Sequence, residues 1–327
     1  MFARYRALLL ALAFAAAPLV SANATEPDHL RLGLVKFGSG AWEIDSIRTH
    51  GLDNAAGVVL DTVELANPAA GEVALQAGGV DAILSDWLWV SRQRRAGQKI
   101  VFIPHSSALG DVMVPAGSVI HSLAELEGHR LGIAGGPNDK SWLLLRAYSR
   151  RVLGHDLADH VEAVYGAPPL LSQELAAGRI DAVLTFWPYA ARLTVGGCRP
   201  VVTMDEVMTG LGFTPPVAMI GYAVTESWLA AHPGGLPRVL GAIDQADRVM
   251  AANDEWDRLR TLTGAPDDAT LAALRDRFRA GIAPRRGAAD QAQASRLFAV
   301  LAETGGAELT GGATDITPGT FWQNASP

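Results

Sequence analysis

The stretch "LAAGRIDAVLTFW" (residues 175–187) repeats a pattern found a hundred residues earlier in "LQAGGVDAILSDW" (residues 75–87). Seven of the thirteen aligned positions are identical, and three more are conservative replacements. The clearest change precedes the final tryptophan, where Asp86 in the first copy corresponds to Phe186 in the second. Each copy combines the end of a helix, a glycine turn and a short apolar strand. The repeat therefore predicts two similar halves.

A second pair of segments extends the repeat toward the N-terminus. The segment "RLGLVKFGSGAW" (31–42) resembles "RLGIAGGPNDKSW" (130–142), and each runs from an apolar strand through glycines to a helix-opening tryptophan. Further strands are predicted at residues 57–65 and 160–166. Strands that alternate with helices indicate βαβ units. We expect an α/β fold with two lobes, each a mainly parallel sheet flanked by helices.

The remaining segments connect these lobes. Residues 112–120 read as a strand leaving the first half, and residues 215–234 as a returning strand with a helix. Residues 236–304 are mainly helical by periodicity, contain no third copy, and are expected to pack on the first lobe. The predicted divisions are lobe 1 from residues 30–116 plus 217–327, lobe 2 from residues 117–216, and a hinge of two crossing strands.

The N-terminal residues read as a secretory signal peptide, residues 1–24, cleaved after about Ala24. Arg4 and Arg6 precede an apolar run over 8–17, and "ANA" (22–24) supplies a small-residue cleavage pattern. We therefore expect a periplasmic protein. Removal of two of the 27 basic residues leaves 25 against 34 acids, a net charge of 25 − 34 = −9. That charge disfavours nucleic acid and anionic membrane as partners.

The sequence lacks the familiar catalytic patterns. It has no G-x-S-x-G, H-E-x-x-H, P-loop or C-x-x-C motif, and Cys198 is its one cysteine, so no intramolecular disulfide can form. We expect no catalytic residues, no cofactor and no metal site. A bare metal ion is also disfavoured as the ligand, because no group of three carboxylates falls at the predicted cleft.

The predicted ligand site lies where the two lobes meet. Ligands of open parallel sheets bind outside the carboxyl ends of the strands, which is where the glycine-rich loops and repeated tryptophans fall. Asp86 offers a carboxylate, Lys140 offers a cation, and the helix starts offer N–H groups for an anion. The predicted ligand-contact residues are Ser39, Gly40, Trp42, Ser85, Asp86, Trp87, Gly136, Lys140, Ser141, Trp142, Thr185, Phe186, Trp187 and Tyr189.

Several of these residues also have a structural interpretation. The tryptophans could be core residues, and Asp86 could cap the helix that follows it. Glu43 fits better as an acid in the first turn of a helix than as a ligand contact. Asp81 and Asp181, which occupy the same place in the two copies, are predicted to hold strand ends or turns.

The stretches "LQAGGVDAILSDW", "GHRLGIAGGPNDKSWLLLRAY" and "LAAGRIDAVLTFWPYAARL" resemble the periplasmic solute-binding proteins of ABC importers. The similarity is to the nitrate/sulfonate/taurine type, which includes binding proteins for thiamin-precursor pyrimidines, and it covers residues 30–280. The resemblance implies a type II periplasmic binding fold, a monomer that captures its ligand by hinge closure, and an ABC permease/ATPase complex at the inner membrane as partner.

The ligand and two other functions stay open at this point. An organic ligand with a sulfonate or carboxylate is slightly favoured over an amine, a flat heterocycle or a zwitterion. The stretches "SDWLWVSRQR" and "GGPNDKSWLLLRAY" also resemble members associated with quinoprotein alcohol oxidation, which suggests a periplasmic accessory binding protein without an importer. A pyrimidine-synthase-like enzyme is the third hypothesis. Those enzymes carry a cysteine-rich motif and active-site histidines, whereas this sequence has the single Cys198 with no neighbouring histidine.

Overall fold

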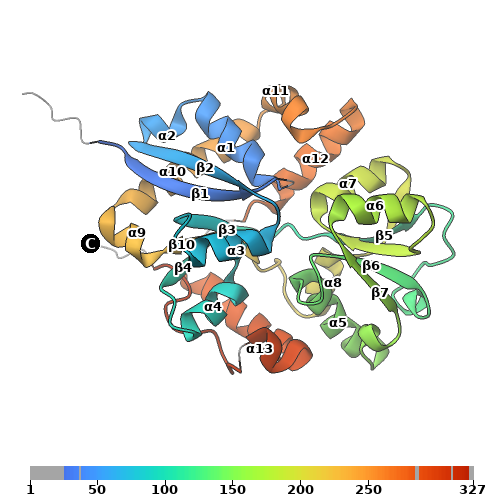
Figure 1. The fold of residues 1–327 in the computed structure, drawn as a ribbon. Helices are drawn as coiled ribbons and strands as arrows, with labels where there is room; N and C mark the ends of the chain where they lie inside the picture. The colour runs from blue at the N-terminus through green and yellow to red at the C-terminus, as the bar shows by residue number, and fades with distance from the viewer. Residues whose placement is uncertain (1–25, 37, 284–286, 311, 324–327) are drawn as a thin grey trace, which may run out of the picture.

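The computed structural model describes residues 26–36, 38–283, 287–310 and 312–323, and it contains two five-stranded sheets (Figure 1). The predicted signal peptide lies outside the described residues. In spatial order, the first sheet contains β2 (Val58–Leu65), β1 (Asp28–Val35), β3 (Ala82–Asp86), β10 (Ile220–Thr225) and β4 (Ile100–Ser106). The second contains β7 (Glu162–Gly166), β6 (Arg130–Ala134), β8 (Ala182–Thr185), β5 (Asp111–Pro115) and β9 (Cys198–Thr203).

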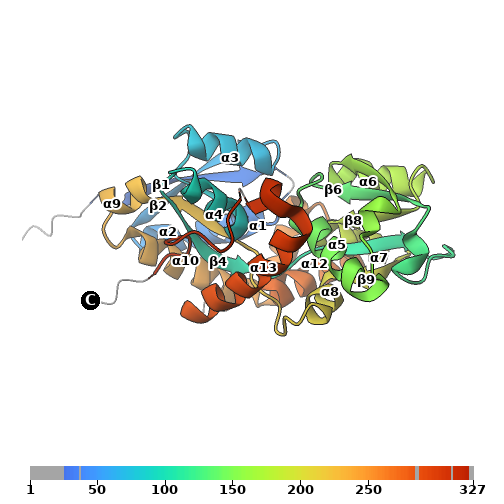
Figure 2. The same ribbon diagram turned by 90° about the horizontal axis from the view of Figure 1, so that it is seen from below.

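The helices cover both faces of each sheet (Figures 1 and 2). The first lobe carries α1 (Gly40–Thr49), α2 (Leu52–Ala55), α3 (Pro68–Gln76), α4 (Trp87–Arg95), α9 (Glu226–Ala231) and α10 (Gly235–Met250). The second carries α5 (Lys140–Leu153), α6 (Pro168–Ala176), α7 (Trp187–Val195) and α8 (Met204–Gly210). The C-terminal helices are α11 (Asn253–Thr263), α12 (Asp268–Gly281) and α13 (Ala288–Thr310). Within the described ranges, none of the helices has both the length and the apolar character of a membrane span.

The two sheets share one topology, which confirms the α/β fold predicted from the repeat. In each sheet three strands pair in parallel, and a strand from the other part of the chain inserts antiparallel beside them. That inserted strand is β10 in the first sheet and β5 in the second. In each lobe, therefore, one strand of the sheet is formed by a segment that has just crossed from the other lobe.

The repeated aspartates have the structural role that the sequence predicts. Asp81 accepts hydrogen bonds from the backbone N–H of Arg31 at 3.0 Å and from its guanidinium at 2.6 and 2.9 Å. Asp181 makes the same contacts with Arg130, at 2.9 Å from the backbone and 3.2 and 3.3 Å from the guanidinium. In both lobes this pair joins the first strand to the turn before the third. The guanidinium lowers the pKa of both carboxyls, although burial opposes the shift.

The structure moves the first crossing between the lobes. The sequence predicts a boundary after residue 116, but β5 (Asp111–Pro115) pairs with β8 and β9 and so belongs to the second sheet. The crossing is the segment 107–110, between β4 and β5. An apolar strand that leaves one sheet and enters another has the same pattern in either, which is why periodicity misplaced this boundary.

The sequence predicts that the C-terminal helices pack on the first lobe. In the structure they contact both lobes. Arg277 of α12 pairs with Asp111 of β5 at 2.5 Å, and the ring of Phe278 lies 6.4 Å from that of Trp187 in α7. Helix α13 contacts both α4 and α5, and its Leu297 and Phe298 enter a core shared with Trp87 and Trp142. These helices therefore bridge the two lobes.

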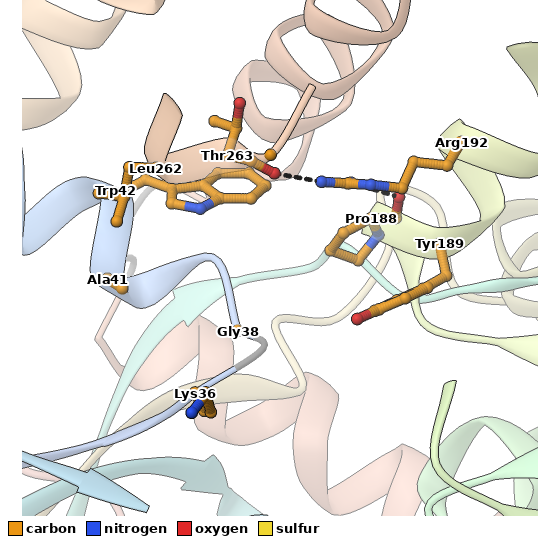
Figure 3. A pocket seen from close by; sticks show the side chains of 10 residues that line it. Lys36, Gly38, Ala41, Trp42, Pro188, Tyr189, Arg192, Leu262 and Thr263 are labelled. Carbon is orange, nitrogen blue, oxygen red and sulfur yellow. Dashed lines mark hydrogen bonds between the residues drawn. The ribbon is translucent and has the colours of Figure 1, made fainter. Parts of the chain in front are cut away.

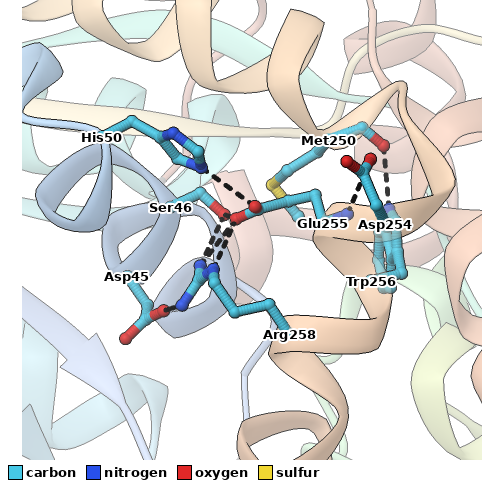
Figure 4. A network of polar contacts seen from close by, with 8 residues as sticks. All are labelled: Asp45, Ser46, His50, Met250, Asp254, Glu255, Trp256 and Arg258. Atoms are coloured by element: carbon cyan, nitrogen blue, oxygen red, sulfur yellow. Dashed lines mark hydrogen bonds and ion pairs between the residues drawn. The ribbon is translucent and has the colours of Figure 1, made fainter.

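A polar network around the buried Glu255 attaches α11 to α1 (Figure 4). Glu255 accepts hydrogen bonds from Ser46 at 2.6 Å and from Arg258 at 2.6 and 3.1 Å, and it contacts His50 Nε2 at 2.9 Å. Arg258 continues to Asp45 at 2.5 Å. Burial alone would raise the pKa of Glu255, but the hydrogen bonds from Arg258, Ser46 and His50 outweigh it and lower the pKa to about 2.

This network predicts acid sensitivity. A carboxyl with a pKa near 4.3 in the unfolded chain and about 2 in the folded protein stabilises the fold above pH ~4.3, and that stability is lost as the pH falls toward 2. We expect Glu255→Gln to cost about 2 kcal/mol at pH 7 and progressively less below pH 4. Urea unfolding at pH 7, 4 and 3 measures this. A loss that is equal at all three values would show that the carboxylate charge is not what stabilises the contact.

Candidate functional site

A pocket of about 150 Å³ lies between the two lobes (Figure 3). One wall is the loop after β1 with the start of α1, and the opposite wall is the first turns of α7 in the second lobe. The end of α11 forms the third wall. The lining residues are Lys36, Gly38, Ala41, Trp42, Pro188, Tyr189, Arg192, Leu262, Thr263 and Gly264. Of the predicted ligand contacts, Trp42 and Tyr189 line this pocket.

Arg192 is the main charged group of the pocket. Its guanidinium donates hydrogen bonds to the carbonyl oxygens of Thr263 and Pro188 and lies 5.9 Å from the ring centroid of Tyr189. Within the described part of the chain it forms no ion pair with a carboxylate. Burial lowers its pKa and raises that of the Tyr189 hydroxyl, but a guanidinium stays protonated at neutral pH. The pocket thus holds a partly buried positive charge.

Lys36 supplies a second cation from the first lobe. It lies at the more exposed side of the pocket, where its ammonium nitrogen is 3.3 Å from a carboxylate oxygen of Glu64. That pair is open to water and weak, so Lys36 can turn toward a ligand at little cost. The two cations come from opposite lobes, which suits an anion held between them.

Trp42, which lines the pocket, also belongs to a cluster of aromatic rings. The Trp42 ring centroid lies 5.8 Å from that of Trp187 and 5.9 Å from that of Trp256, both in edge-on geometry. These rings join α1, α7 and α11 in one apolar cluster with Phe278. Trp187 therefore acts as an interlobe contact rather than lining the pocket, whereas Trp42 does both.

The predicted charged residues also meet across the lobes, outside this pocket. Lys140, the first residue of α5, has its nitrogen 4.0 Å from Oδ2 of Asp86 at the end of β3. Asp86 caps α4 as well, because its Oδ1 accepts the N–H of Trp89 at 2.8 Å. Nearby Glu72 has a pKa raised to about 7, chiefly by burial and then by Asp86, against the lowering effect of Arg92 and Lys140.

The other predicted residues are placed by the helix starts that hold them. Ser39 precedes α1 and Gly40 begins it, while Ser85 comes directly before Asp86, the last residue of β3. Gly136, at φ +99°, belongs to the loop before α5, whose Asp139 caps the N–H groups of Ser141 and Trp142. Phe186 precedes α7 and packs against a separate core in the second lobe. Trp142 is buried in the core that joins the two lobes.

Two predicted contacts are buried with a polar atom unsatisfied. Trp87 is 0% exposed and Thr185 is 1% exposed, and neither Trp87 Nε1 nor Thr185 Oγ1 has a hydrogen-bond partner among the described residues. One residue stands in each lobe, at the same end of the repeated stretch. An unpaired buried donor costs about 1–3 kcal/mol, and a ligand oxygen would relieve that cost.

Thr185→Val tests this assignment, because valine keeps the shape of threonine and removes the hydroxyl. If the hydroxyl contacts ligand, we expect the affinity to fall by about tenfold, the worth of one hydrogen bond of ~1.4 kcal/mol, without loss of stability. Titration calorimetry and thermal melting measure both quantities. An unchanged affinity with a changed melting temperature would assign Thr185 to the fold alone.

Sequence reasoning missed Lys36, Arg192 and the wall at residues 262–264. Lys36 stands inside the quoted segment 31–42, so its place after a strand was a usable signal. Arg192 lies about one helical turn beyond the repeated stretch, in "PYAARL", where a single arginine gives no sign of a ligand contact. The third wall comes from a part of the chain with no repeat.

Two groups of described residues could hold a metal ion, namely Glu127 with His155 and His160, and Glu43 with His105 and Asp247. The first group is largely exposed, and the second is largely buried. The residues of each group are far apart in the sequence or irregularly spaced, so the sequence alone predicts no metal site.

Comparison with known proteins supports this architecture. The alkanesulfonate-binding protein SsuA from Xanthomonas axonopodis pv. citri, bound to MOPS, superposes with a TM-score of 0.69 at 20% identity, over 91% of this chain and 99% of that one. The periplasmic aliphatic sulphonate binding protein SsuA from Escherichia coli gives 0.71 at 20% identity, over 91% and 92%. The desulfurization enzyme DSZB gives 0.56 at 19% identity, over 85% and 92%.

No curated protein matches the chain. The family described as NMT1/THI5 like matches residues 49–255, which is well over half of the chain. With two similar lobes, segments that cross between them and an interlobe pocket, the chain has the type II periplasmic binding fold and belongs to the NMT1/THI5-like family.

Proposed function

We propose that the protein is the periplasmic substrate-binding component of an ABC importer and captures a small organic anion between its lobes. The observation that carries this proposal is Arg192, a partly buried guanidinium without an acidic partner in the described residues, facing a pocket between the lobes. A buried cation is costly unless an anion accompanies it. The ligand supplies that anion, as a sulfonate or carboxylate.

The remaining groups support a ligand with an apolar or aromatic part. Trp42 and Tyr189 offer ring surfaces next to Arg192. Trp87 Nε1 and Thr185 Oγ1 do not line this pocket, but they are buried polar atoms without a hydrogen-bond partner in the described residues and would be further donors for a ligand group that reaches them. Because these groups belong to different lobes, a ligand that contacts both stabilises the closed form over the open one. Recognition of the closed form by a permease and its ATPase would complete import.

The pair Asp86–Lys140 adds an interlobe contact that needs no ligand. Its 4.0 Å separation and partial exposure make it a weak pair, which suits lobes that must open again. A zwitterionic ligand would have both charges available here, with Asp86 for the cationic end and Lys140 for the anionic end.

Titration calorimetry with matched ligands tests the proposal. The probes are MOPS, which one similar structure contains, a straight-chain alkanesulfonate, its carboxylate analogue, and the alkylammonium of equal chain length. We expect at least one anion to bind and the ammonium not to bind. Binding of the ammonium alone would move the ligand class to cations and Asp86. Turnover of a probe, followed by mass spectrometry, would favour an enzyme of the same fold.

A further inference from the structure

Glu43, His105 and Asp247 form a compact group inside the first lobe. They come from α1, the end of β4 and α10, and one possible ligand atom of each lies within 4.8 Å of the other two. Glu43 is 0% exposed and His105 is 8% exposed. The group is separate from the anion pocket, although Glu43 directly follows Trp42 in α1.

The spacing of the group fits ligands that share a metal ion. Nε2 of His105 lies 3.4 Å from Oε1 of Glu43. A charge-assisted hydrogen bond between such groups is normally about 2.7–2.9 Å long. Two ligand atoms that each lie about 2.0–2.2 Å from a tetrahedral zinc ion are roughly 3.3–3.6 Å apart. The observed distance is long for a hydrogen-bonded pair and close to that for two zinc ligands.

A second contact orients the group. The Tyr222 hydroxyl donates a hydrogen bond of 2.6 Å to Oε2 of Glu43 and is itself buried. Oε1 is thereby directed toward His105. Ligands in metal sites are commonly fixed by such an outer hydrogen bond to the atom that does not bind the ion.

The composition of the group is also compatible with a bound cation. Two carboxylates at close range in a buried site need either a proton or a metal cation between them. An imidazole nitrogen with two carboxylate oxygens is a ligand set that zinc accepts, with one position left for water. We propose that Glu43, His105 and Asp247 bind one divalent zinc ion.

Such an ion would join three elements that meet beside the pocket. It would tie α1, which carries Trp42, to α10 and to the end of β4, which leads into the crossing segment 107–110. The ion would therefore fix the first-lobe wall of the pocket and the base of the hinge, while taking no part in ligand contact.

Zinc itself is the probe for the test. The full mature chain is stripped with EDTA, titrated with Zn²⁺ by calorimetry, and melted with and without the metal. We expect one high-affinity ion per chain and a higher melting temperature in zinc. His105→Gln and Asp247→Asn should each weaken that binding by ~100-fold or more, because a lost ligand costs at least as much as a lost outer contact. Tyr222→Phe should weaken it by about 10–100-fold.

The exposed group Glu127, His155 and His160 provides the matched control. Among the described residues this is the only other group that could hold a metal. The double variant His155→Gln/His160→Gln changes that group and leaves Glu43, His105 and Asp247 intact, so it should keep the high-affinity site. Loss of binding in that variant, with binding retained in Asp247→Asn, would overturn the proposal. Failure of the wild-type chain to bind Zn²⁺ below roughly 10 µM would overturn it as well. The anion titrations above are independent of either result.

Discussion

Replacing Gly110 with alanine should destabilise the protein by about 4 kcal/mol or more. Gly110 ends the crossing segment between the lobes, and a Cβ atom there would lie 1.4 Å from the carbonyl oxygen of Thr185. The clash is with backbone at the end of β8, so rotating a side chain cannot relieve it. Either the crossing segment or the Thr185–Phe186 loop must move, and both belong to the interlobe region.

Gly117→Ala is the matched control for this prediction. Its added Cβ would meet no atom within 4 Å, and its backbone lies outside the left-handed region. We expect Gly117→Ala to change the free energy of unfolding by less than about 1 kcal/mol. Urea unfolding at neutral pH compares the two variants. Equal stability of both would mean that the crossing segment does not pack against Thr185.

Replacing Arg192 with methionine should weaken the binding of an anionic ligand by about 100-fold. The guanidinium is the partly buried cation of the pocket, and a charge-assisted hydrogen bond removed from such a site is worth ~1.5–3 kcal/mol. Arg192→Lys keeps the charge but loses the planar fork and the carbonyl contacts, so its loss should be smaller, about tenfold. Calorimetric titration with the tightest anion of the probe set gives both values.

Arg151→Met controls for net charge in this comparison. Arg151 is exposed on α5 of the same lobe, and its replacement removes one positive charge far from the pocket lining. We expect its affinity to match that of the wild-type protein. An equal loss in Arg151→Met and Arg192→Met would assign the effect to long-range attraction instead of contact, and thermal melting confirms that each variant is folded.

The sequence was most informative where it repeats itself. Because both halves carry the same strand, glycine and aspartate pattern, two lobes of one topology and the structural roles of Asp81 and Asp181 could be predicted. The crossing at 107–110 could not, since an apolar strand has the same alternation in whichever sheet it enters. Nor could the bridging position of α12 and α13, whose apolar faces do not specify their partner.

The site was predictable in part. The rule that ligands bind where helices start after strands led to Trp42 and Tyr189, which line the pocket. It also led to Asp86 and Lys140, which lie close together in the structure. The pattern could not separate a tryptophan that lines a pocket from one that packs inside, and Trp142 and Trp187 are core or interlobe contacts in the structure. Arg192 lies outside the repeated stretch 175–187. Its position in the pocket depends on a hydrogen bond to the carbonyl of Thr263, some seventy residues later, which no local pattern indicates.

Native mass spectrometry tests the central claim most directly, namely that one small anion is held by groups of both lobes. The wild-type protein, Lys36→Met and Arg192→Met would be exported to a bacterial periplasm, purified gently and then incubated with the tightest anion of the probe set. We predict one bound anion per wild-type chain, released on partial unfolding, with less than about a tenth of that occupancy in Arg192→Met and a reduced occupancy in Lys36→Met. Full occupancy in both variants, or none in the wild-type protein, would contradict the account.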